Sequence, residues 1–126
     1  MLTVALVFAG LAALVHVYIF WLEALAFDSV GRKAFGVTAE DAAVMKPWAY
    51  NQGFYNLFLA IGTATGIAVE HANRDAGVAL VLLGVGSMLA AATVLITSDP
   101  GKARGAVVQG TFPLVALVLM AIWGWA

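Results

Sequence analysis

Long apolar runs separated by short polar clusters dominate the chain. Four such runs cover about 2–27, 48–69, 76–97 and 105–126. Each meets or exceeds the ~20 residues that an α-helix needs to cross the apolar core of a bilayer. A spanning helix also satisfies its own backbone hydrogen bonds, which lipid cannot do for it. The pattern therefore predicts an all-α integral membrane four-helix bundle, with residues 1–126 forming a single transmembrane domain.

The composition agrees with a membrane protein and excludes several other classes. Only 10% of the 126 residues are charged, against about 25% in soluble domains. The chain has no cysteine, which excludes disulfides and thiolate metal sites. A net charge of −1 without a basic cluster gives no basis for binding nucleic acid. The expected partners are the lipid bilayer and a small amphiphilic ligand or lipid, with a homo-oligomer as a further possibility.

The basic residues predict how the helices are oriented. Five of the six Lys and Arg residues lie in the first and third connections between the runs, namely Arg32, Lys33, Lys46, Lys102 and Arg104. With four spans these two connections share one side, which the positive-inside rule makes cytoplasmic. Both termini are then predicted outside, in a multi-pass protein of the cell membrane. His71, in the short outer connection, is expected to be solvated rather than to bind a metal.

The connections contain recognisable start and stop signals. In "TAEDAAVMKP", 38–47, Thr38 suits a helix N-cap with Asp41 three residues on, and Pro47 suits a stop. A short interfacial helix at about 39–46 is therefore predicted, with a solvated connector as the alternative. "SDPG", 98–101, predicts a tight turn between the third and fourth runs.

Glycines in the middle runs have spacings that suit close helix contacts. Gly62 and Gly66 form the small-xxx-small pattern "GTATG", and Gly77, Gly84 and Gly86 lie in the third run. Small residues let helix backbones approach closely in lipid. We expect these glycines to serve packing.

Two ionisable residues interrupt the first run, His16 and Glu23 in "HVYIFWLEALAF", 16–27. In a regular helix, residues seven apart differ by about 20° around the axis and about 10 Å along it. The two side chains therefore face the same way but do not hydrogen-bond each other directly. A charged group at the bilayer centre costs about 2.5–3.5 kcal/mol. We expect water, a ligand or polar groups of another helix to lie between them.

Polar groups in two other runs fall at similar calculated depths. "NQGFYNLFLAIG", 51–62, carries three amides in its first two turns, and "VQGTFP", 108–113, carries Gln109 four residues before Pro113. Proline cannot donate to the carbonyl of Gln109, which leaves that oxygen free. The sequence thus predicts a polar cavity in the cytoplasmic half of the bundle. Its candidate acid–base residues are Glu23 and His16, and its candidate ligand-binding residues are Asn51, Gln52, Tyr55, Asn56, Gln109 and Tyr18.

The quoted segments also resemble a known family. "HVYIFWLEALAF", "AFG" at 34–36 and "NQGFYNLFLAIG" are similar to the bacterial and fungal family catalogued as domain of unknown function 1304. The resemblance covers essentially the whole chain, in length and in four-helix layout. In similar proteins an aromatic residue follows the glutamate, and Phe27 is the nearest candidate here. The characteristic set that the resemblance implies is His16, Glu23, Asn51, Gln52, Gly53, Tyr55 and Asn56, without an established activity.

Several functions remain open on sequence alone. The favoured one is binding, or acid–base processing, of a small amphiphile, with Glu23 exchanging a proton and His16 as its partner. The alternatives are a small-solute or proton-coupled transporter acting as an oligomer, and a purely structural polar network. A metal site is disfavoured because one His and one Glu about 10 Å apart do not share an ion. No cofactor is expected, and whether the protein is an enzyme is left open.

Overall fold

The computed structural model describes residues 1–125, which fold into helices joined by short turns. The elements are α1 (Leu2–Phe20), η1 (Trp21–Leu25), η2 (Phe27–Gly31), α2 (Arg32–Ala34), α3 (Ala39–Glu70), α4 (Arg74–Ser98), η3 (Pro100–Lys102) and α5 (Ala103–Trp125). The all-α prediction is therefore confirmed. The predicted fourth run ends at Ala126, which lies outside the described residues.

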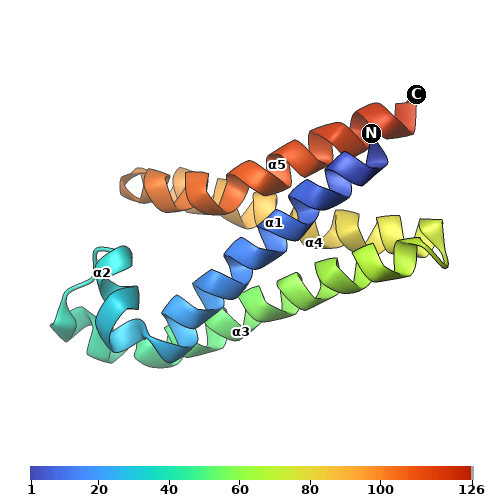
Figure 1. Ribbon diagram of the computed structural model, residues 1–126. Helices are drawn as coiled ribbons and strands as arrows, with labels where there is room; N and C mark the ends of the chain where they lie inside the picture. The colour runs from blue at the N-terminus through green and yellow to red at the C-terminus, as the bar shows by residue number, and fades with distance from the viewer. Residues whose placement is uncertain (126) are drawn as a thin grey trace.

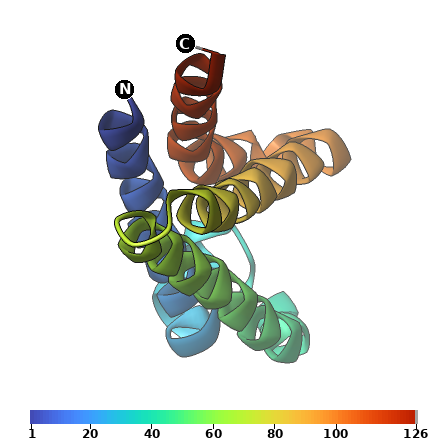
Figure 2. The same ribbon diagram turned by 90° about the vertical axis from the view of Figure 1, so that its right-hand side faces the viewer.

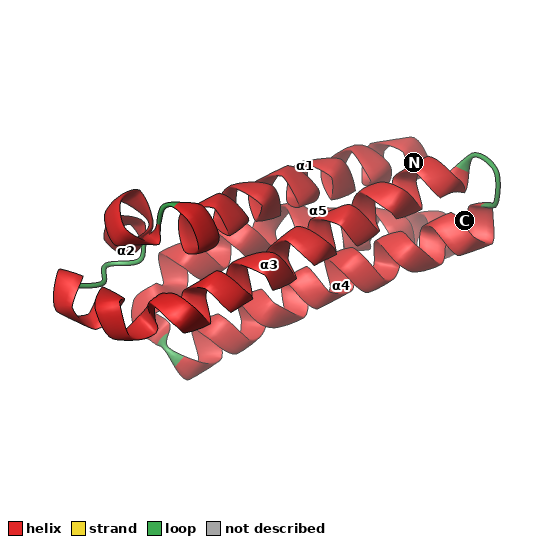
Figure 3. Ribbon diagram, turned by 90° about the horizontal axis from the view of Figure 1, so that it is seen from below, coloured by secondary structure: helices red, strands yellow, loops and turns green. Residues whose placement is uncertain are grey.

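The four long helices form a ring in which α1 packs against α3 and α5, and α4 packs against the same two (Figure 3). The first residues of α1 lie at the same end of the molecule as the turn between α3 and α4 (Figure 1). The opposite end carries α2 and the turn between α4 and α5. We call this the basic end, because it holds Arg32, Lys33, Lys46, Lys102 and Arg104; the other is the terminal end.

Helix α1 changes neighbour along its length. It lies beside α5 at the terminal end and leans toward α3 at the basic end (Figures 1 and 2). Two ring contacts mark the change: Phe8 meets Phe112 of α5 with ring centroids 6.1 Å apart, and Phe20 meets Phe54 of α3 at 5.2 Å. Polar residues in the last turns of α1 consequently face α3.

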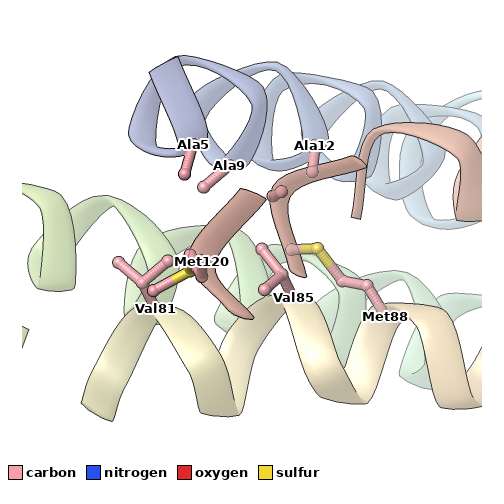
Figure 4. Packing of buried hydrophobic residues seen from close by; sticks show 8 residues of the cluster. Ala5, Ala9, Ala12, Val81, Val85, Met88 and Met120 are labelled. Carbon is pink, nitrogen blue, oxygen red and sulfur yellow. The ribbon is translucent and has the colours of Figure 1, made fainter. Parts of the chain in front are cut away.

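The core between the helices is built from alanine, valine and methionine side chains. It contains Ala5, Ala9 and Ala12 of α1, Val81, Val85 and Met88 of α4, and Ala116 and Met120 of α5 (Figure 4). The alanines recur at the three- and four-residue spacing that places them on one helix face. Small residues on this face let the helices pack closely through van der Waals contacts.

Three helical segments are long and apolar enough to cross a membrane, namely Leu2–Leu25, Arg74–Ser98 and Pro100–Trp125. These lengths and compositions indicate a membrane-type helical protein. Helix α3 is longer than any of them, but amides and glycines lower the hydropathy of its predicted span, 48–69. A fourth span over 48–69 and the orientation of the termini stay predictions.

The expected stop at Pro47 is wrong. Thr38 does cap a helix, because its hydroxyl accepts a hydrogen bond from the backbone N–H of Asp41 at 3.1 Å. That helix is α3, however, which runs through Pro47 to Glu70 instead of ending at 46. Proline removes one bond, to the carbonyl of Ala43. Ala43 is exposed, so surrounding water is able to satisfy the freed oxygen.

The prediction of a regular helix over 2–27 also needs correction at its end. From Trp21 the chain winds as π-helix, with the N–H of Ala26 donating to the carbonyl of Trp21 at 2.9 Å and that of Gly31 to Ala26 at 2.8 Å. Gly31 lies so near this segment that a Cβ would sit 2.0 Å from the carbonyl oxygen of Leu22. The chain therefore turns back tightly at the basic end, which only glycine permits.

Candidate polar site between helices α1 and α3

A carboxyl and an amide meet where η1 packs against α3. The amide nitrogen of Asn56 donates to Oε2 of Glu23 at 2.7 Å and to the carbonyl oxygen of Gln52 at 3.2 Å. Asn56 is only 7% exposed, and Glu23 is half-buried. Both hydrogens of the Asn56 amide are thus used, which fixes the orientation of the side chain. Within residues 1–125, Oε1 of Glu23 accepts no hydrogen bond.

Gly53 allows this contact to form. A Cβ at Gly53 would lie 3.0 Å from both the Cβ and the backbone nitrogen of Ala24, and 3.2 Å from the Cβ of Glu23. The backbones of α3 and η1 therefore approach more closely than a side chain would permit. Asn56 stands one turn further along α3, on the same face, so the approach at Gly53 brings it within reach of Glu23.

His16 occupies a separate position, two turns from Glu23 along α1. Its side chain is fully buried, at 0% exposure, and Nδ1 donates to the carbonyl oxygen of Ala12 at 2.8 Å. That bond places the hydrogen of the neutral ring on Nδ1, so Nε2 carries a lone pair. Within residues 1–125, Nε2 is buried and has no hydrogen-bond partner. An unpaired acceptor of this kind costs about 1–3 kcal/mol.

Aromatic rings flank the Glu23–Asn56 contact, a feature that the sequence reasoning missed. Phe54 packs edge-on against Phe20, with centroids 5.2 Å apart, and also contacts Tyr50 at 5.1 Å. Tyr18 stacks on Trp21 at 6.0 Å. The signal was present as aromatic residues four apart in "YNQGFYNLF", 50–58. Rings with polar edges suit the level where lipid headgroups meet acyl chains.

The other predicted ligand-binding residues on α1 and α3 lie at the surface. Asn51, Gln52, Tyr55 and Tyr18 are all exposed, and Gln52 joins the site through its backbone carbonyl. Their side chains form no hydrogen bond with Glu23 or Asn56 within residues 1–125. The structure therefore brings together Glu23, Asn56 and one backbone oxygen of the predicted set.

Gln109 is not part of this cluster. It is half-buried on α5, and the Phe8–Phe112 contact sets the antiparallel register between α1 and α5. At the basic end α1 leans away from α5 toward α3 (Figures 1 and 2), and the side chain of Gln109 forms no hydrogen bond with Glu23 or Asn56 within residues 1–125. Depth along a helix, which the sequence provides, does not include this lean.

No cluster of three His, Cys, Asp or Glu residues within residues 1–125 has the geometry to hold a metal ion. The chemistry that these residues offer is hydrogen bonding and proton exchange. The carboxyl of Glu23 is able to do both, and Nε2 of His16 is able to accept a hydrogen.

The fold and the site together define a membrane-type helical protein with a partly buried carboxyl–amide contact between two helices. The chain belongs to the family described as "Protein of unknown function (DUF1304)", which matches residues 10–121. That match includes Glu23, Asn56 and His16. No curated protein and no solved structure matches the chain.

Proposed function

We propose that the protein crosses the cell membrane four times, with the basic end in the cytoplasm and both termini outside. Helix α3 has 32 residues, a length of about 48 Å at 1.5 Å per residue, which exceeds the ~30 Å apolar core. Its first turns would then extend into the cytoplasmic interface. Trp48 near the basic end and Trp123 near the terminal end are placed as interfacial aromatics.

We further propose that the site between α1 and α3 binds a small amphiphile by its polar headgroup. The observation that carries this proposal is hydrogen-bonding capacity that the protein leaves unused at one buried atom, Nε2 of His16, and at one half-buried carboxyl, that of Glu23. Nε2 of His16 has no donor, and Oε1 of Glu23 accepts nothing within residues 1–125. A ligand hydroxyl or amine would satisfy the carboxyl, while its apolar part would lie against the exposed aromatic rings of Tyr18 and Tyr55.

The same groups would support proton transfer to or from such a ligand. Glu23 is oriented by Asn56, as a general acid or base must be. His16 lies deeper along α1 and would accept a hydrogen at Nε2. A reaction that moves a proton within the bound molecule, such as an isomerisation, fits this pair.

A purely structural network is the competing account, and His16 separates the two. Asn56 and Glu23 would stabilise the α1–α3 contact whether or not a ligand binds. A structural role accounts for the hydrogen bond from Nδ1 of His16 to Ala12 but not for the buried lone pair at Nε2, which has no partner within residues 1–125. The unpaired atom therefore favours a site with a missing partner.

A photoreactive fatty alcohol, with its diazirine beside the hydroxyl group, tests the binding proposal. We expect cross-links to concentrate in peptides covering 16–27 and 51–58, at least threefold above peptides of α4. Glu23→Gln should abolish that excess. Glu70→Gln is the matched control, because it makes the same chemical change at the terminal end, where Glu70 pairs with Arg74.

Even labelling along all helices would contradict the proposed site. An excess that survives Glu23→Gln would show that the carboxyl takes no part in binding. Loss of the excess in both variants would indicate a general effect of removing a carboxylate and would count equally against the proposal.

A further inference from the structure

A second feature lies on the other side of the molecule, between α4 and α5 toward the basic end. It is an open groove of about 210 Å³. Its walls include Leu89, Thr93 and Ile96 of α4 and Val107, Thr111 and Leu114 of α5. None of the residues placed in the α1–α3 site lines it, so this groove is independent of the proposed ligand site, although the inference rests on the proposed crossing of the membrane.

The groove has an apolar surface in spite of its two threonines. The hydroxyl of Thr93 donates to the carbonyl of Leu89 at 2.9 Å, and that of Thr111 to the carbonyl of Val107 at 2.6 Å. Each hydroxyl is satisfied within its own helix and offers little to a polar ligand. At Gly110 a Cβ would lie 3.0 Å from the Cβ of Ala92, so the helices meet closely at the floor.

The dimensions suit one lipid chain. From Ala106 to Leu114 the α5 wall extends eight residues, about 12 Å at 1.5 Å per residue. One leaflet contributes about half of the ~30 Å apolar core, or about 15 Å. The α5 wall of the groove therefore matches the length of an acyl chain within one leaflet.

Arg104 places a positive charge at the end of the groove that lies toward the basic end of the molecule. Arg104 precedes Val107 by three residues and Thr111 by seven, which places it on the same face of α5. Arg104 is exposed and makes no ion pair within residues 1–125, whereas Lys46 pairs with Asp28. The nearby carboxylate of Asp99 accepts from the backbone N–H of Gly101 at 3.1 Å.

We infer that the groove binds an acyl chain of an anionic phospholipid, with Arg104 holding the phosphate. The apolar walls supply contact along one leaflet, and the guanidinium supplies the preference for a negative headgroup. A single basic residue near a membrane surface favours an anionic lipid by about fivefold in affinity.

Native mass spectrometry of the delipidated protein, titrated with phosphatidylglycerol or phosphatidylcholine of identical chains, tests this inference. We expect phosphatidylglycerol to bind about fivefold more tightly. Arg104→Gln should reduce its affinity to that of phosphatidylcholine. Thr111→Phe, which fills the groove from an exposed position, should weaken both lipids at least threefold. Val118→Phe, on an exposed part of α5 away from the groove, should leave both unchanged.

Equal affinities for the two lipids in the unmodified protein would overturn the inference. So would an Arg104→Gln variant that keeps its preference. If Arg104→Gln removes the preference while Thr111→Phe changes nothing, the headgroup binds at the surface and the groove plays no part. Equal losses in Thr111→Phe and Val118→Phe would also exclude the groove.

Discussion

Asn56 is the residue on which the α1–α3 site depends, because both of its amide hydrogens are used. One is bonded to Glu23 at 2.7 Å and the other to its own helix at Gln52. Hydrogen bonds between membrane helices contribute about 0.6 kcal/mol on average and at most about 1.7. A double-mutant cycle of Glu23→Ala and Asn56→Ala, measured by unfolding in mixed detergent micelles, should give a coupling free energy within about 0.5–1.7 kcal/mol.

Additive effects of the two substitutions would show that the side chains do not interact in the folded protein. Thr65→Ala combined with Glu23→Ala serves as the control cycle. The hydroxyl of Thr65 is exposed and bonds within its own helix, so those two substitutions should add without coupling.

Replacement of the His16 ring tests whether this residue serves the fold or the site. Its Nε2 is buried without a partner, so replacing the ring by an apolar side chain removes an unpaired acceptor. His16→Leu should therefore leave the unfolding free energy of the ligand-free protein equal or raise it by about 1 kcal/mol. It should also reduce photolabelling of 16–27. A loss of stability above about 2 kcal/mol would mean that His16 serves the fold.

At the scale of the helix pair, glycines that look alike in sequence make different contacts. A Cβ at Gly66 would lie 2.8 Å from the backbone nitrogen of Val81 and 2.9 Å from the carbonyl oxygen of Gly77, whereas one at Gly62 meets nothing within 4 Å. Gly66→Ala should lower the unfolding free energy by about 1–3 kcal/mol, because backbone must move. Gly62→Ala should be neutral or stabilise by up to about 1 kcal/mol.

Equal effects of the two alanine substitutions would contradict the α3–α4 packing. Gly84→Ala and Gly86→Ala form a second matched pair on α4. A Cβ at Gly84 would meet the hydroxyl of Thr63 at 2.1 Å, and one at Gly86 meets nothing within 4 Å.

The sequence predicted the helical class, the cap at Thr38 and the turn after Ser98, because each depends on local chemistry. It did not predict the passage of α3 through Pro47 or the π-helical winding after Trp21. The first feature depends on solvent reaching the freed carbonyl of Ala43. The second depends on the close approach of Gly31 to the backbone of Leu22, nine residues earlier. Periodicity carries no information about either contact.

The candidate site was predictable only in part, for the same reason. Residue type and depth identified Glu23 and Asn56, which do meet. Depth along a helix gives no information about the lean of α1 from α5 toward α3 (Figures 1 and 2), so the role of Gln109 as a ligand-binding residue stays a prediction. Gly53 was known from the family resemblance, but its role in the close approach became visible only with the neighbouring backbone in place.

For the whole molecule, the proposed orientation places the α3–α4 turn outside the cell and the first turn of α3 in the cytoplasm. The chain has no cysteine, so single cysteines introduce unique sites. His71→Cys, exposed in the α3–α4 turn, should react with an impermeant maleimide on intact cells. Glu40→Cys, exposed in the first turn of α3, should react only after permeabilisation. Reaction of both sites from the same side would exclude passage of α3 through the membrane, and the reverse pattern would invert the orientation.

Binding of one specific molecule by the polar groups between α1 and α3 is the main proposal for this protein. Its most direct test is mass spectrometry of the small molecules that remain bound through gentle detergent purification. Unmodified protein, Glu23→Gln and the control Glu70→Gln would be purified side by side. We expect one bound species to be enriched in the unmodified protein and in Glu70→Gln and to be lost from Glu23→Gln. Identical bulk-lipid profiles in all three would contradict it and leave Glu23 and Asn56 as a structural contact.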